Sequence, residues 1–361
     1  MKVLRLILSR PLILCLSLAL FFNPALTASA AGYRAHVLVS NLPGIGDHTD
    51  PDLLNAWGLV VAPGGDLIVA DNHSNLATFY RPDGRRLPIA INADEAPTGL
   101  VMNRSWYDFI IGTGRNRAAS VLLFSTEAGT ILGWNPAVNN AAVIAVDNSS
   151  SGAVYKGIAL GSRNGRRFIY ATDFHNGKVD MFDGAFHMVG SFTDPTVDPG
   201  FAPFNVQNIR GTLWVTFALQ KAPDNADDQS GPGNGFVDVF DLNGRMLSRF
   251  ASHGALNSPW GMALAPRSFG KFANALLIGN FGDGTINAFN PGTGHFLGQL
   301  ADANNVPIQI NGLWALRFGR SAAGHDADGD EDDNTGRTNT LFFTAGPNEE
   351  NDGLLGFIRP D

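Results

Sequence analysis

The sequence predicts an all-β protein, a six-bladed β-propeller of four-stranded blades, and three observations support this fold class. A strand phrase that contains an aromatic residue recurs six times along the chain, and five of its copies begin with glycine. A second, apolar strand precedes most copies, and a short fourth strand follows most of them. One further strand near the N-terminus is left over, and a ring of blades needs such a strand to close.

The glycine-led phrase is the third strand of each repeat. It reads Gly-Lys-Val-Asp-Met-Phe-Asp at 177–183, Gly-Phe-Val-Asp-Val-Phe-Asp at 235–241 and Gly-Thr-Ile-Asn-Ala-Phe-Asn at 284–290. Residues 129–135 match it, and 75–80 and 353–358 are weaker copies. Because β-branched and aromatic residues bounded by turn residues favour strands, each copy predicts one strand.

The second strand is apolar and ends in a small or polar residue, as at 67–71 and 168–173. Upstream of it, the inner strand opens with tryptophan in three repeats. We align the six repeats on the residue that directly follows this tryptophan position, which gives these equivalent residues: Gly58, Gly99, Gly157, Gln207, Gly261 and Ala315. Their mean spacing is about 51 residues, and four strands in about 50 residues are typical of a propeller blade. The second repeat fits least well, because residues 106–120 hold an insertion that obscures its strand register.

The ends of the chain predict how the ring closes. The sixth repeat ends at its third strand, 354–358, and has no fourth. We expect the N-terminal strand 36–40 to pair into this last blade, which leaves no unpaired edge between the first and last blades.

Composition excludes several other classes of protein. Of 361 residues, 16% are charged and 44% are hydrophobic, with 42 glycines and 20 prolines, which fits neither a disordered chain nor a coiled coil. The formal net charge of −8 offers nothing to neutralise a phosphate backbone, so we expect no nucleic-acid partner.

Residues 1–30 have the pattern of a signal peptide. They contain no acidic residue, carry Lys2, Arg5 and Arg10, continue with a short apolar stretch and end in Ala-Ser-Ala. Cleavage would leave 31–361 as a single propeller domain without cysteine, because Cys15 lies in the leader. We therefore expect an exported protein, periplasmic or extracellular, that is a monomer and has no transmembrane segment after cleavage.

Propeller topology brings the loops between second and third strands to one face, here called the upper face, around the mouth of the central channel. These loops and residues 41–54 hold 12 of the 33 acidic residues and one cation, Lys221, and such a rim attracts cations. The candidate metal ligands in it are Asp71, His73, Asp173, His175 and Asp283. Carboxylates favour Ca²⁺ or Mg²⁺, so calcium or magnesium is the cofactor these residues would hold. The alternative is that each aspartate caps a tight turn.

Two further sets of residues stand near the starts of the inner strands. The first set consists of single amides, which would either contact a ligand or serve only the local structure: Asn55, Gln207, Asn257 and Asn311. The tryptophans Trp57, Trp260 and Trp314 would either stack a sugar or aromatic ligand or pack between neighbouring blades.

An acidic segment at 326–334 is the most conspicuous local motif. Alternating aspartates resemble the start of a calcium loop: Asp326, Asp328, Asp330 and Asp332. The sixth position is Glu331 where an EF-hand needs glycine, and the twelfth is Arg337 where it needs glutamate. A structural calcium site and a solvated acidic insertion both remain open.

The strand phrases at 67–71 and 177–183 resemble NHL-type propeller repeats. The whole chain after the leader is similar to a family of uncharacterised exported bacterial propeller proteins. The resemblance lies in these segments: 55–59, 129–136, 201–209, 231–241, 256–266, 279–289 and 311–318. Some members of that family carry a PEP-CTERM sorting tail, and nothing after Leu354 resembles one. The resemblance implies a propeller fold and export, and it implies no established activity or catalytic residue.

Three functions follow as alternatives. The first is a binding or scaffold module that takes a protein or small-molecule ligand through the acidic upper face. The second is a metal-dependent hydrolase of the lactonase or esterase type, with a divalent ion at the channel mouth. The third is a calcium-stabilised surface or matrix protein. The sequence favours a non-enzymatic role, because it has no Gly-x-Ser-x-Gly, His-Glu-x-x-His or phosphate-loop motif and no carboxylate at the inner-strand starts.

Overall fold

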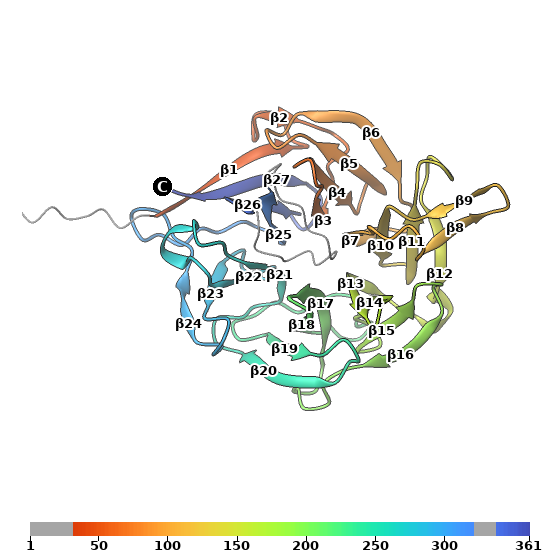
Figure 1. Ribbon diagram of the computed structural model, residues 1–361. Helices are drawn as coiled ribbons and strands as arrows, with labels where there is room; N and C mark the ends of the chain where they lie inside the picture. Colours follow the sequence, from red (N-terminus) through yellow and green to blue (C-terminus); the bar gives the residue numbers. More distant parts are fainter. Residues whose placement is uncertain (1–31, 321–336) are drawn as a thin grey trace, which may run out of the picture.

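The computed structural model describes residues 32–320 and 337–361, and these form a ring of six β-sheets around a central axis (Figure 1). The predicted six-bladed propeller of four-stranded blades is confirmed. From the inner strand outward, blade 1 consists of β3 (Ala56–Val61), β4 (Leu67–Asp71), β5 (Leu76–Tyr80) and β6 (Arg86–Asn92). Blade 2 consists of β7 (Pro97–Met102), β10 (Leu122–Thr126), β11 (Thr130–Trp134) and β12 (Val143–Asp147). Blade 3 consists of β13 (Tyr155–Arg163), β14 (Arg166–Asp173), β15 (Lys178–Asp183) and β16 (Met188–Phe192).

Blades 4 and 5 repeat this order, with no additional named strand between their four strands. They consist of β17 (Phe201–Ile209), β18 (Thr212–Leu219), β19 (Phe236–Phe240) and β20 (Met246–Ser252), then β21 (Pro259–Leu264), β22 (Leu276–Asn280), β23 (Ile286–Phe289) and β24 (Phe296–Gln299). The only helical segments among the described residues are two 3₁₀ turns, Ser149–Ser151 and Gly270–Phe272.

Blade 6 joins the two ends of the chain, as predicted. Its inner strands are β25 (Leu313–Arg320), β26 (Arg337–Ala345) and β27 (Leu354–Pro360), and β1 (Tyr33–Ser40) is the fourth. β1 pairs antiparallel with β27 from Tyr33 opposite Pro360 to Ser40 opposite Leu354. The closing strand is three residues longer than the predicted 36–40, and β2 (His48–Thr49) adds a short parallel fifth strand.

The insertion in blade 2 is a β-hairpin. Its strands, β8 (Ile110–Thr113) and β9 (Asn116–Ala119), project from the perimeter of the ring (Figure 1). The Phe109 amide donates to the Gly184 carbonyl at 2.6 Å, which ties the insertion to blade 3. The second strand of the blade therefore starts only at Leu122, and the second-to-third loop is 127–129.

The repeat alignment was wrong in blade 4. Inner strands approach so closely that a Cβ at Gly58 would lie 2.4 Å from the Thr98 carbonyl oxygen, and glycine fits there for this reason. In the same way, the neighbour of Gly157 is Asn205, whose Oδ1 would lie 2.3 Å from an added Cβ. Gln207 is two residues further along and is buried within β17 rather than before it. The alignment failed here because Asn205 stands where most inner strands have the glycine that marks this position.

Aromatic side chains fill the axis of the ring. The rings of Trp57 and Trp314 stack with centroids 3.7 Å apart, and Phe281 stacks on Trp314 at 4.0 Å. Trp260 meets Trp314 edge to face at 5.8 Å, and Phe204 lies 5.9 Å from the same ring. These contacts join blades 1, 4, 5 and 6, so the three tryptophans pack across the axis.

Candidate functional site

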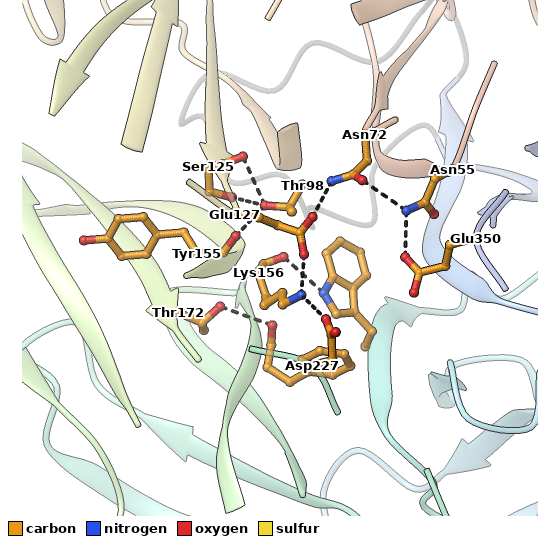
Figure 2. A network of polar contacts seen from close by, with 12 residues as sticks. Asn55, Asn72, Thr98, Ser125, Glu127, Tyr155, Lys156, Thr172, Asp227 and Glu350 are labelled. Carbon is orange, nitrogen blue, oxygen red and sulfur yellow. Dashed lines mark hydrogen bonds and ion pairs between the residues drawn. The ribbon is translucent and has the colours of Figure 1, made fainter. Parts of the chain in front are cut away.

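A buried lysine at the upper mouth of the channel is the centre of the candidate site (Figure 2). Lys156, the second residue of β13, has a side chain only 3% exposed. Its Nζ lies 2.5 Å from Glu127 Oε1 and 3.2 Å from Asp227 Oδ1, which come from upper loops of blades 2 and 4. The same Nζ lies 5.1 Å from the centroid of the Trp57 ring. A single ammonium group is thus held between two carboxylates and an indole.

A chain of amide hydrogen bonds connects this lysine to a third carboxylate (Figure 2). Asn72 Nδ2 donates to Glu127 Oε2 at 2.9 Å, and Asn55 Nδ2 donates to Asn72 Oδ1 at 3.2 Å. Asn55 Nδ2 also donates to Glu350 Oε2 at 2.7 Å. Trp314 Nε1 donates to Asn55 Oδ1 at 2.9 Å, which sets the orientation of the amide. The carboxylates of blades 2 and 6 therefore have defined positions around the mouth.

Glu350 lies on a strained turn. Asn348, Glu349 and Glu350 have φ values of 57°, 54° and 65°, so three consecutive residues other than glycine occupy the left-handed region. Each such residue costs roughly 1–2 kcal/mol in an L-amino-acid chain. Strain of this kind persists where the surrounding structure imposes it, and it is common at binding and catalytic sites.

The two ionisable groups at the centre have perturbed pKa values. Burial alone would lower the pKa of Lys156, but the carboxylates of Glu127 and Asp227 outweigh burial and raise the pKa above its ordinary value. Burial raises the pKa of Glu350 to about 7, although the Lys156 charge and the Asn55 hydrogen bond oppose the shift. Lys156 is therefore a permanent cation, and Glu350 exchanges a proton near neutral pH.

This arrangement has definite chemical abilities. A permanently protonated lysine is a poor nucleophile, so Lys156 is unsuited to forming a Schiff base. Three carboxylates around one ammonium group leave a net negative charge that attracts cations. Glu350 is also the kind of group that donates or accepts a proton at neutral pH.

Two of the predicted aspartate ligands accept hydrogen bonds from groups near their own blades. Asp71 is fully buried at the end of β4, where its Oδ2 accepts a hydrogen bond from Thr78 Oγ1 at 2.6 Å and burial raises its pKa. Asp173, at the same place in blade 3, accepts from the Val154 amide at 3.2 Å and from Asn176 Nδ2 at 2.8 Å. The contact between Asp173 and Asn176 lies within one turn and matches the turn-capping alternative.

The remaining predicted ligands are also apart from one another. His73 is exposed, and His175 Nδ1 lies 2.9 Å from the Asp224 carbonyl oxygen. Asp283 accepts from the Thr285 amide at 3.0 Å and from its hydroxyl at 2.7 Å. Within 32–320 and 337–361, no three His, Cys, Asp or Glu side chains are grouped so that they could hold a metal ion. The structure therefore does not bring these five residues together.

The amides and tryptophans near the inner-strand starts have different roles. Asn55 is part of the mouth network, whereas Asn257 Oδ1 accepts from the Gly231 amide at 2.7 Å and orders a neighbouring loop. Asn311 is exposed, and Gln207 is buried within its strand. The three tryptophans are at most 5% exposed and cover one another, which leaves no open indole face for a ligand. Asp326, Asp328, Asp330 and Asp332 lie outside the described residues.

Sequence reasoning missed Lys156 and Glu127. Lys156 stands immediately before Gly157, at the position where three other blades have tryptophan. A single charged residue at that position of the repeat was the signal that could have identified it. Glu127 was hidden because the insertion in blade 2 obscured the second-to-third loop. The sequence predicted that the loop of Glu350 lies on the acidic rim, but it did not predict the hydrogen bond between Glu350 and Asn55.

Fold and mouth together define this chain as a six-bladed β-propeller with a preorganised polar cluster on its upper face. The chain is 30% identical over 358 residues to the uncharacterized protein L690 of Acanthamoeba polyphaga mimivirus, which covers 94% of this chain and 90% of that protein. It is 30% identical over 344 residues to the uncharacterized protein R648 of the same virus, covering 91% and 80%. The chain belongs to the same family as these two proteins. No protein-family model matches it.

Solved structures show the same fold at low identity. Virginiamycin B lyase from Staphylococcus aureus superposes with a TM-score of 0.51 at 12% identity, over 91% of this chain and 99% of that one. A luciferin-regenerating enzyme superposes with a TM-score of 0.51 at 10% identity, over 91% and 95%. At these identities the likeness shows the propeller fold alone. The relatives by sequence are viral, so membership of an exported bacterial family stays a prediction.

Within residues 32–320 and 337–361, no helix has the length and apolar character needed to cross a bilayer.

Proposed function

We propose that this protein is a binding module that takes a positively charged ligand at the upper mouth of the propeller. The observation that carries the proposal is the convergence of Glu127, Asp227 and Glu350, from three different blades, around one buried lysine. Lys156 neutralises only part of their charge. A rigid acidic mouth raises the local concentration of a cationic group and presents it with acceptors already in position.

The ligand in this proposal is an organic cation, such as an amine or a guanidinium group, carried by a small molecule or by a protein. A metal ion fits the mouth less well, because the Lys156 ammonium group already lies between the carboxylates and would repel a divalent ion at close range. An amine or guanidinium group needs only hydrogen-bond acceptors at the rim. Asp227, whose side chain is largely exposed, supplies such acceptors.

Isothermal titration calorimetry with spermidine, an arginine amide, Mg²⁺ and a neutral sugar tests this function. We expect heat of binding with the organic cations only, and tighter binding at a pH well above 7, where Glu350 carries its charge. Glu350→Gln should weaken binding by about fivefold to tenfold, since one nearby charge near a protein surface contributes on the order of 1 kcal/mol. Glu349→Gln is the matched control, because Glu349 is exposed on the same turn. Equal affinity in the two variants, or no binding of any cation, would contradict the proposal.

Export is part of the same proposal and rests on residues 1–30. Their basic start, short apolar stretch and Ala-Ser-Ala ending support cleavage near Ala31. N-terminal sequencing of the protein recovered from the cell envelope or medium tests it, and a chain that still begins at Met1 would refute it.

A further inference from the structure

In blades 2 to 4, the lower face of the propeller has the opposite charge to the upper face. It carries the loops between first and second strands and the turns between third and fourth strands. In blades 2 to 4 these are residues 103–121, 163–167, 183–189, 210 and 241–247, which we call the lower patch. The lower patch holds eight arginines against three aspartates. Blades 2 to 4 are therefore basic on this side, although the whole chain is acidic.

The segments of the lower patch form one continuous surface. Phe109 of the blade 2 insertion lies 5.5 Å, centroid to centroid, from Phe186 in the outer turn of blade 3. Arg163 of blade 3 donates to the Leu242 carbonyl at 3.1 Å and to Asn243 Oδ1 at 2.7 Å, in the outer turn of blade 4. Each inner hairpin thus rests on the outer turn of the next blade.

The aspartates of the lower patch are committed to their own turns. Asp108 accepts from Ser105 Oγ at 2.5 Å, Asp183 from the Ala185 amide at 2.9 Å, and Asp241 from the Asn243 amide at 2.8 Å. Five of the arginines are exposed to solvent: Arg115, Arg117, Arg166, Arg210 and Arg245. The charge that an approaching partner meets is therefore predominantly positive.

Exposed apolar side chains gather on the same side. Of the twelve large hydrophobic side chains that are exposed among the described residues, eight lie in lower loops or at the lower ends of outer strands, and three lie in upper connections. Trp106 and Tyr107 are the most exposed of all, at 84% and 88%. Met188, Val189 and Leu247 lie on the outer strands of the next two blades.

The aromatic pair is held rigidly in this exposed position. Asn103 Nδ2 donates to the Ser120 carbonyl at 2.9 Å, and its Oδ1 accepts from the Ser105 amide at 2.9 Å. Ser105 Oγ then accepts from the Tyr107 amide at 3.2 Å. Because the loop is already ordered, a partner that covers Trp106 and Tyr107 does not have to order it.

From the shared location of the arginines and the exposed apolar side chains, we infer that the lower patch docks the protein on the surface of an anionic lipid bilayer. Arginines attract anionic headgroups, and tryptophan and tyrosine favour the boundary between headgroups and acyl chains. A soluble polyanion would pair with the arginines but leave Met188, Val189 and Leu247 exposed to water. Docking in this orientation also turns the acidic upper face away from the lipid charge and leaves the mouth open, so the inference is independent of the proposed function.

Sedimentation with vesicles tests this inference. The full chain is mixed at low salt with vesicles of phosphatidylcholine alone or of phosphatidylcholine with phosphatidylglycerol. We expect binding to the mixed vesicles to exceed binding to neutral ones by at least about tenfold and to weaken in high salt. All variants keep residues 1–31, so any lipid affinity of that segment is equal in the comparisons among variants.

Two variants and one control separate the contribution of the arginines to vesicle binding from that of the exposed aromatic residues. Replacing Arg115, Arg117 and Arg166 by Gln should reduce binding to the mixed vesicles by about a hundredfold, since each cation near an anionic surface contributes about fivefold. Trp106→Ala with Tyr107→Ala should reduce the binding that persists in high salt. Ile45→Ala with Lys221→Gln changes an exposed apolar residue and a cation of the upper side and should change nothing.

Thermal unfolding verifies that every variant is folded, and all the substituted side chains have exposed or peripheral positions. Equal binding to neutral and mixed vesicles would overturn the inference, as would full binding by the arginine variant. Tight binding to heparin that ignores the Trp106 and Tyr107 substitutions, without binding to vesicles, would identify a soluble polyanion instead and would also overturn it.

Discussion

Replacing Glu350 by glutamine should make the protein more stable at neutral and alkaline pH, and the effect should disappear in acid. Glutamine has the same shape, and it keeps the hydrogen bond that Asn55 Nδ2 donates. It cannot ionise in the partly buried site. Lys156 keeps its contacts with Glu127 and Asp227, so no charge is left unpaired.

The sign follows from the direction of the pKa shift. The pKa of Glu350 is raised from an ordinary 4.5 to about 7 in the folded protein, mainly by burial. The contribution of this group to stability is therefore complete below pH 4.5 and is lost as the pH rises through about 7. One pKa unit is about 1.4 kcal/mol, so the full difference corresponds to about 3 kcal/mol. Partial contact with water reduces this, and we expect between about 1 and 3 kcal/mol.

Urea denaturation between about pH 4 and pH 9 measures the effect. The free energy of unfolding of the wild type should fall over the interval in which Glu350 ionises, whereas that of Glu350→Gln should be flatter. Glu349→Gln, on the same left-handed turn, should retain the wild-type profile. A constant difference between the wild type and Glu350→Gln at every pH would refute the reasoning, since it would show that Glu350 ionises in the folded state as it does in the unfolded chain.

The remaining predictions concern the lysine, the closing strand and the metal hypotheses. Lys156→Met should lower the free energy of unfolding by about 3–5 kcal/mol, because it leaves two carboxylates without their cation; urea denaturation showing a loss below about 1 kcal/mol would contradict this. Deleting residues 33–40 should abolish cooperative thermal unfolding, because it exposes the β27 edge and opens the ring; an unchanged melting temperature would show that β1 is dispensable. Elemental analysis should find the same metal content in the wild type and in the Asp71→Asn, Asp173→Asn variant, whereas loss of about one equivalent in the variant would support the hydrolase hypothesis. If residues 326–334 order around calcium, EDTA should lower the melting temperature of the full chain but not of a chain lacking this segment.

The blade pattern was readable from sequence because its causes are local. Alternating β-branched and aromatic residues between glycines and aspartates define where each strand begins and ends, and a repeat of about 50 residues then limits the architecture. The missing fourth strand in the last repeat, together with the unassigned strand near residue 36, was enough to predict the closure that β1 and β27 make. Errors arose where local signals stop, at Asn205, which stands where most inner strands have glycine, and at the inserted hairpin of blade 2.

The candidate site depends on information that no local pattern contains. Asn55, Glu127, Lys156, Asp227 and Glu350 are separated by up to 295 residues along the chain and meet because their loops share one end of the ring. Topology alone predicted that acidic loops would gather there. Which carboxylates face inward depends on details such as the left-handed turn at 348–350. Which aspartates serve their own turns depends on hydrogen bonds such as that from the Thr285 amide to Asp283.

The sequence by itself thus determined the number of blades, their strand order and the closure of the ring, because strands form from short-range preferences that repeat. Only the tertiary structure decided that a single lysine lies beneath three carboxylates, that the tryptophans cover one another, and that arginines and exposed aromatic residues occupy the opposite face. Burial and electrostatic interactions depend on distances between side chains, and these are set only when distant loops are brought together by the closed ring.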